Sequence, residues 1–167
     1  REPGCGPQDR LLAVTTLSFD IAGLELYLPL TVGGTVELCT HVEAADGRLL
    51  RRKLETVKPT IMQATPATWR MLVESGWQGA SQLTVLCGGE SLPRDLADAL
   101  LQRCARLWNM YGPTETTIWS AAMALDGAVA DLSDPIERDV KIEFLNRDDP
   151  RAGNEPPRVR ACARGSG

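Results

Sequence analysis

Residues 109–117 hold the side chains of the chain that are best suited to chemistry, in a hydroxyl-rich turn after an apolar run. Tyr111 offers a flat ring on which a base can stack, and Gly112 lets a ligand approach the backbone. Thr114 has a hydroxyl suited to phosphate oxygens, and Glu115 is a hard oxygen ligand for Mg2+. Side chains suited to a base, to phosphate and to a metal ion in one turn indicate a nucleotide site. A Gly-Pro turn with Thr caps would explain the same residues.

Four segments of the chain resemble the amino-acid adenylation domains of nonribosomal peptide synthetases, which belong to the adenylate-forming AMP-binding ligases. Residues 109–117 resemble their Asn-x-Tyr-Gly-Pro-Thr-Glu motif, and residues 17–25 resemble their earlier Phe-Asp motif. Residues 63–69 and 87–93 match the connecting segments in the expected order. The resemblance covers about residues 1–122, and four matches in order make it specific.

The resemblance implies an amino-acid pocket. Asp20 occupies the place of the carboxylate that pairs with the substrate ammonium in this family, and a buried carboxylate is costly unless a cation matches it. Asp20 would otherwise serve as the N-cap of a helix that starts at Ile21. By motif spacing, the lining residues of the pocket are Asp20, Ile21, Leu24, Gln63, Leu86, Gly88, Met110, Ile118 and Trp119.

The order of residue types in this pocket resembles the signature associated with glycine activation. Trp119, Met110, Gln63 and Leu24 are bulky and would fill the volume that a substrate side chain needs. A filled pocket rejects larger amino acids sterically, so alanine is the closest competitor. For the aliphatic members of the set, ordinary core packing would explain the same residue types.

The resemblance also implies ATP and Mg2+. Tyr111 would pack on the base, Thr114 would touch the α-phosphate, and Glu115 would hold the metal. The nucleotide contacts are expected from Gly88, Gly89, Glu90, Asn109, Tyr111, Gly112 and Thr114. The implied reaction joins an amino acid to AMP with release of pyrophosphate, and the acyl group then passes to a phosphopantetheine thiol on a carrier domain beside other synthetase domains. Such a step depends on positioning and charge neutralisation, so no residue is assigned covalent catalysis.

Alternating helices and strands must position these groups. Leu24, Tyr27 and Leu28 recur at helical spacing after Ile21, and Thr65-Pro66 is typical of a helix start. Further helices are expected at 46–57 and after Pro93, and strands at 11–16, 35–39, 60–63 and 83–87. The pattern predicts an α/β fold with a largely parallel sheet, part of the large N-terminal subdomain of an adenylate-forming enzyme. Ligands bind beyond the carboxyl ends of such strands, where Asp20, Gln63, Gly88 and the Tyr111 turn all fall.

Composition narrows the possible partners. The net charge of -4 argues against nucleic acid or an anionic membrane, and no apolar run approaches the ~20 residues of a spanning helix. The five cysteines include no Cys-x-x-Cys pair, so a disulfide framework or a zinc site is not expected. Cys39, Cys87 and Cys104 are interpreted as small buried hydrophobes, reduced in the cytoplasm.

The pattern weakens after Ala122, and residues 123–167 are expected to be a divergent or poorly ordered tail, in which Val140–Leu145 would be a strand. The family's phosphate loop should precede residue 1, and its Gly-Asp segment and lid lysine are not recognised. We therefore expect that this chain alone binds nucleotide weakly and does not turn over.

Three alternatives to amino-acid activation differ in what they require of the sequence. An acyl- or aryl-acid ligase of the same superfamily would not need Asp20. A non-catalytic fragment would explain the missing loop and lysine. A Ser-His-Asp hydrolase is disfavoured because His41 is the single histidine, expected on a solvated loop, and no Gly-x-Ser-x-Gly elbow is present.

Overall fold

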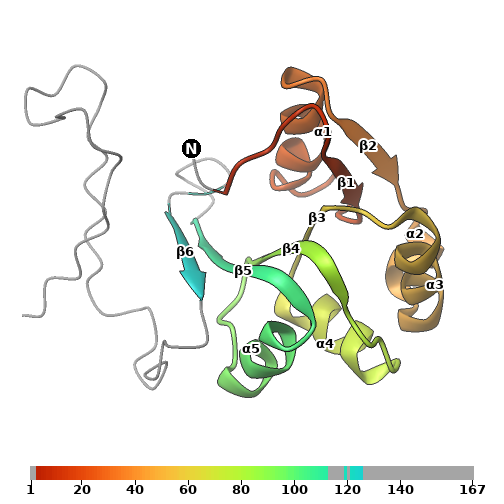
Figure 1. Cartoon of the computed structure of the whole chain (residues 1–167), viewed down its shortest axis with the longest axis vertical. Coiled ribbons are helices and arrows are strands. Elements are labelled where there is room, and N and C mark those ends of the chain that lie inside the picture. The colour runs from red at the N-terminus through yellow and green to blue at the C-terminus, as the bar shows by residue number, and fades with distance from the viewer. Residues whose placement is uncertain (1–2, 113–118, 120, 126–167) are drawn as a thin grey trace, which may run out of the picture.

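The computed structural model describes residues 3–112, 119 and 121–125 of the chain. In this part, a six-stranded sheet has the order β2-β1-β3-β4-β5-β6 (Figure 1). Its strands are β1 (Arg10–Ala13), β2 (Thr35–Leu38), β3 (Ile61–Ala64), β4 (Ala80–Gly88), β5 (Cys104–Tyr111) and β6 (Ala121–Leu125). The helices are α1 (Ala22–Thr31), α2 (His41–Ala45), α3 (Gly47–Val57), α4 (Pro66–Glu74) and α5 (Arg94–Leu101).

The first five strands are parallel, which confirms the predicted α/β fold with a largely parallel sheet. β6 was not anticipated: it pairs antiparallel with β5 and continues to Leu125. The predicted strand at 140–145 lies outside the described residues.

Capping side chains set the helix starts that the sequence predicted. The Asp46 carboxylate accepts from the backbone N–H groups of Arg48 and Leu49, and it satisfies two donors that the first turn of α3 leaves free. The Thr65 hydroxyl accepts from the Thr68 N–H at the start of α4, with Pro66 as the first helical residue. α3 ends where Lys58 adopts the left-handed conformation, with φ of 49°.

Two local expectations are wrong. His41 does not lie on a loop: it begins α2, because Thr40 and Glu43 form a reciprocal capping box. β1 stops at Ala13 rather than continuing to Thr16. The N–H groups of Val14 and Thr15 donate to the Glu25 carboxylate, so they do not join the sheet.

α1 is confirmed as a helix, but its buried stripe is not the one that its leucines suggest. Its buried residues are Ala22, Glu25 and Pro29, whereas Tyr27 is 69% exposed. The helix therefore places a carboxylate at the centre of its contact with the sheet.

Alternation along the strands divides the buried side chains between the two faces of the sheet. One face, here called the α3–α5 face, packs Leu12, Met62, Val85 and Leu107 against α3, α4 and α5. The opposite face, the α1 face, carries Leu11, Ile61, Leu86, Trp108 and Met110, with Leu24 and Leu26 of α1 packed against them. Figure 1 shows α4 and α5 on one side of the sheet and α1 on the other.

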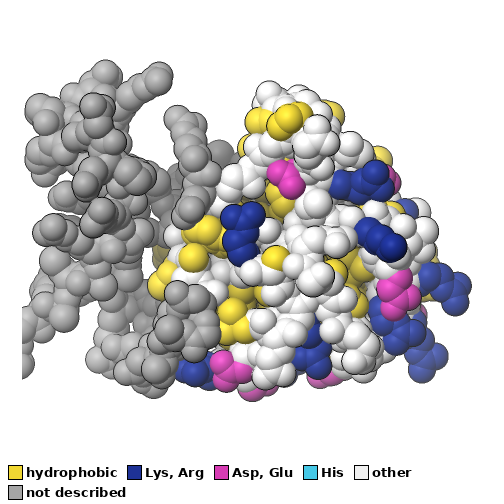
Figure 2. Space-filling view, in the orientation of Figure 1, with side chains coloured by type: hydrophobic (Ala, Val, Ile, Leu, Met, Phe, Trp, Pro, Cys, Tyr) yellow, Lys and Arg dark blue, Asp and Glu magenta, His cyan; other side chains and the backbone are white. Residues whose placement is uncertain are grey.

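Basic side chains gather on one side of the surface (Figure 2), and the cysteines differ in burial. Figure 2 shows Lys and Arg side chains over the α2–α3 side of the molecule. Cys87 is buried as expected, whereas Cys39 and Cys104 are half-buried, and all the cysteines that the structure describes are free thiols.

Candidate functional site

Strand alternation brings four predicted pocket residues onto the α1 face. Leu86 and Met110 belong to its apolar cluster. Gln63 pairs with Leu86 in the sheet, and Gly88 pairs with Met110. All four are buried at or near the carboxyl ends of their strands, where a parallel sheet binds ligands.

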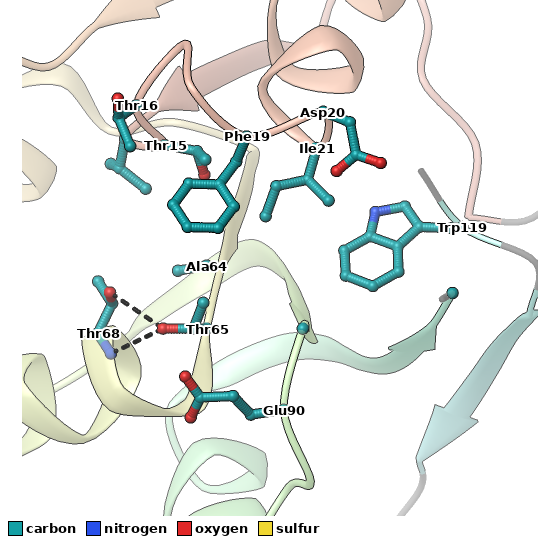
Figure 3. A pocket seen from close by; sticks show the side chains of 13 residues that line it. Thr15, Thr16, Phe19, Asp20, Ile21, Ala64, Thr65, Thr68, Glu90 and Trp119 are labelled. Carbon is teal, nitrogen blue, oxygen red and sulfur yellow. Dashed lines mark hydrogen bonds between the residues drawn. The ribbon is translucent and has the colours of Figure 1, made fainter. Parts of the chain in front are cut away.

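A cavity of about 370 Å3 opens above these strand ends. Of the predicted site residues, Asp20, Ile21, Gly89, Glu90, Gly112 and Trp119 line it. Figure 3 shows the Asp20 carboxylate on the Trp119 side of the cavity, and Thr65, Thr68 and Glu90 on the other side. The cavity thus joins residues predicted for the amino acid to residues predicted for the nucleotide.

Asp20 precedes α1 in the loop that follows β1. The N-cap position of α1 is Ile21, and no side chain at that position caps the helix. The Asp20 carbonyl accepts from the Gly23 N–H, so the backbone of this residue begins the turn into α1. The side chain is exposed and lines the cavity, where it is accessible to a ligand.

Trp119 is held by Gln63. Its indole Nε1–H donates to Gln63 Oε1 at 2.6 Å, and the ring packs against the apolar cluster of the α1 face. A Cβ added at Gly88 would lie 2.5 Å from Trp119 Cη2 and 2.5 Å from the Met110 carbonyl oxygen. Gly88 is therefore the residue that leaves room for the indole.

Glu25 lies next to the cavity and supports residues of the site, a role that was not predicted from the sequence. It is fully buried, and its carboxylate accepts from Gln63 Nε2 at 3.0 Å and from the N–H and hydroxyl of Thr15. Burial raises the pKa of the Glu25 carboxyl, and these hydrogen bonds oppose the rise. A spacing of three and four residues between Ala22, Glu25 and Pro29 was the available signal, because it marks one helix face.

Several cavity residues carry hydroxyl groups that the sequence reasoning did not assign to the site. Thr15 and Thr16 follow β1, and Thr65 and Thr68 lie at the start of α4. Phe19 also lines the cavity although its side chain is largely exposed. Thr65 was predicted as a helix cap. In the structure it caps α4 and also lines the cavity.

Some predicted residues do not line the cavity. Leu24, Gln63, Leu86, Gly88 and Met110 lie beside or beneath it rather than on its surface.

On the nucleotide side, Tyr111 is 56% exposed and is not among the lining residues. Asn109 is buried and lies between Trp108 and Met110 in β5. Those two side chains point to the α1 face, so strand alternation places the Asn109 side chain toward the α3–α5 face. Thr114, Glu115 and Ile118 lie outside the described residues. Within the described part, no three His, Cys, Asp or Glu side chains gather as metal ligands, and no helix is long and apolar enough to cross a bilayer.

The protein family of AMP-binding enzymes matches residues 1–149 of the chain. The chain belongs to this family. The dimodular nonribosomal peptide synthase of Bacillus subtilis (strain 168) is 46% identical over 121 residues, which are 72% of this chain and 5% of that protein. The chain thus spans about a twentieth of the length of this curated relative.

Two solved structures have a fold similar to that of this chain. The crystal structure of holo-AB3403, a four-domain nonribosomal peptide synthetase bound to AMP and glycine, has a TM-score of 0.72 and 48% identity, covering 73% of this chain and 9% of that one. The N-terminal subdomain of Klebsiella oxytoca NpsA has a TM-score of 0.66 at 21% identity, covering 75% of this chain and 33% of that one, and it shows the fold. The resemblance to adenylation domains and to their N-terminal subdomain is confirmed.

Proposed function

We propose that the chain forms the amino-acid pocket and the adjoining adenosine site of a nonribosomal peptide synthetase adenylation domain. The activity is ATP-dependent formation of an aminoacyl-adenylate. One observation carries the proposal: a single cavity is lined by Asp20 and Trp119, predicted for the amino acid, and by Gly89, Glu90 and Gly112, predicted for the nucleotide.

Asp20 supplies the charge that an amino-acid substrate needs. Its carboxylate lines the cavity beside the apolar side chain of Ile21, and an ammonium group bound there would be paired when water is displaced. A neutral or aryl carboxylic acid has no group to pair with this carboxylate. The position of Asp20 therefore favours an amino acid over the acids used by acyl- or aryl-acid ligases.

We propose glycine as the amino acid. Trp119 is held by Gln63, lies against Gly88 and lines the cavity, so its indole would limit the volume open to a substrate side chain. Steric exclusion by such a wall rejects larger acids, whereas alanine is rejected least. The 48% identical relative bound to AMP and glycine supports this choice.

In the proposed reaction a carboxylate oxygen of the amino acid attacks the α-phosphorus of ATP, and the bond to pyrophosphate breaks. The chain binds and orients the two substrates. Glu115 is proposed to hold Mg2+, which would neutralise phosphate charge, and Thr114 is proposed to touch the α-phosphate. A carrier domain bearing phosphopantetheine is the proposed acceptor of the acyl group, in a cytoplasmic assembly.

The test is amino-acid-dependent ATP–pyrophosphate exchange by the full-length protein that carries this chain. Glycine should give the highest rate, alanine a lower one, and larger amino acids none above background. Asp20→Asn should abolish exchange, because the amide leaves the substrate ammonium unpaired. Asp98→Asn is the matched control, since Asp98 pairs with Arg94 on the surface of α5.

Two results would contradict the proposal. Unchanged exchange in Asp20→Asn would favour an acyl- or aryl-acid ligase. Absence of exchange with every amino acid tested would favour a non-catalytic chain. Residues 1–167 on their own are proposed to bind nucleotide weakly without turnover, because they hold no Ser/Thr/Gly-rich phosphate loop and no lysine in a lid context. Robust exchange by residues 1–167 would contradict that part.

A further inference from the structure

A buried carboxylate lies behind the wall of the cavity. Glu25 Oε2 accepts from the N–H groups of Val14 at 2.9 Å and Thr15 at 3.0 Å. Glu25 Oε1 accepts from the Thr15 hydroxyl at 2.5 Å and from Gln63 Nε2 at 3.0 Å. Every partner is a donor, so an ionised carboxylate satisfies the whole arrangement. Glu25 thus fixes the loop after β1 and also holds Gln63.

The Gln63 amide has one orientation in this setting. Its Nε2 donates both to Glu25 Oε1 and to the Ile21 carbonyl at 3.0 Å. A flipped amide would turn its oxygen toward two acceptors, which repel it. The amide oxygen must therefore point the other way, where it meets the indole of Trp119.

The indole N–H can only donate, so it needs that oxygen. Glu25, together with the Ile21 carbonyl, consequently orients Trp119 through a single intervening side chain, although Glu25 and Trp119 lie 94 positions apart in the sequence. Ser or Thr hydroxyls would not transmit this choice, because a hydroxyl both donates and accepts.

We propose that Glu25 is a positioning residue that sets the size limit of the amino-acid pocket by holding Gln63, and through it Trp119, in one orientation. The specificity part rests on the proposed function. The positioning part does not, because it concerns the geometry of the chain itself.

The first experiment follows the indole N–H signals of the 15N-labelled full chain by NMR. Trp119→Phe identifies the Trp119 signal, and Trp69 serves as an internal reporter of folding, because its indole donates to the Leu86 carbonyl outside this network. In Glu25→Gln the side chain has one acceptor oxygen instead of two. The Trp119 signal should shift and its hydrogen exchange should accelerate about tenfold, the factor that corresponds to one net hydrogen bond.

Glu55→Gln is the matched control, since Glu55 is an exposed partner of Arg51 on α3. It should leave the Trp119 signal in place. If Glu25→Gln loses the Trp69 signal as well, the variant has not folded, and Gln63→Met decides instead, because it removes the relay while keeping the bonds of Glu25 to Val14 and Thr15. An unmoved Trp119 signal in a folded Glu25→Gln chain, or in Gln63→Met, would overturn the proposal.

The second experiment measures kcat/KM for glycine and alanine in ATP–pyrophosphate exchange by the full-length protein. Glu25→Gln should lower the glycine-to-alanine ratio about tenfold, whereas a purely structural role would lower both values equally. An unchanged ratio with a displaced Trp119 signal would overturn the specificity part. Absence of exchange in the unsubstituted protein would contradict the proposed function and leave the NMR result to decide positioning.

Discussion

The α3–α5 face and the α1 face of the sheet bury different kinds of side chain. On the α3–α5 face Trp69 and Leu72 of α4 belong to one large apolar cluster with Leu12 and Val85 of the sheet. On the α1 face the apolar cluster is smaller, and Glu25 and Gln63 lie beside it with Thr84, as three of the four buried polar side chains in the described part.

The two faces therefore have different roles, one in stability and the other in fixing a geometry. Apolar burial is the main source of stability and tolerates little loss of volume, so the α3–α5 face supplies most of the free energy of folding. A buried polar network contributes less net free energy but fixes one geometry, because each donor must meet its acceptor. The α1 face is therefore the one that holds a pocket wall in place.

The largest expected effect is on stability and tests the α3–α5 face. Trp69→Ala removes a fully buried ring that packs near Trp77, with ring centroids 6.0 Å apart. It should lower the free energy of unfolding by about 3–5 kcal/mol, measured by urea denaturation followed by far-UV circular dichroism. Trp69→Phe should cost less because it keeps most of the volume. A loss below ~1 kcal/mol would mean that this face is not the main store of stability.

A smaller stability effect with a large functional effect is expected on the α1 face. Gly88→Ala places a Cβ against Trp119 and the Met110 carbonyl, and this overpacking should cost about 1–3 kcal/mol. Displacing the indole should lower glycine-dependent exchange by about a hundredfold.

Gly6→Ala is the matched control for Gly88→Ala, since a Cβ at Gly6 meets nothing closer than 3.8 Å. Equal losses of exchange in the two variants would contradict the proposed difference in role between the two faces.

The smallest expected effect concerns Asp46, which lies outside both faces. Hydrogen bonds from the N–H groups of Leu49 and Arg48 lower the pKa of Asp46 below its ordinary value of 3.8. A lowered folded pKa means that the stabilisation is complete above the unfolded value and is lost as the pH falls through the folded value. Asp46→Ala should therefore reduce the Tm at pH 7, and the difference from the unsubstituted chain should shrink below about pH 4.

Thermal melts between pH 3 and pH 7 test this expectation for Asp46. A difference in Tm that grew toward pH 3 would contradict the sign.

The features that could be predicted from the sequence depend on the strand period of two and on helix caps made by neighbouring residues. A strand period of two sends Gln63, Leu86, Gly88 and Met110 to positions on one face, so the motif spacing was enough to group them. Thr65-Pro66 fixed the start of α4 because the cap needs only neighbouring residues.

The misses have different causes. The Thr40-x-x-Glu43 capping box is a local sequence signal for the start of α2, and the prediction of a loop at His41 did not take it into account. Glu25 was harder to predict, because a charged helix residue is usually exposed. Its burial depends on Gln63, 38 residues away in sequence, and on backbone donors freed by the early end of β1. Such a match arises only once the strands are paired.

The hydrogen bond from Trp119 to Gln63 joins residues 56 positions apart. Closing so long a stretch of chain costs entropy that is recovered only when the parallel strands between them have assembled. The pocket wall should therefore be among the last parts of the chain to acquire its native form during refolding. A Trp119 signal that appears later than the Trp69 signal would show that the core of the chain folds before the proposed substrate pocket forms.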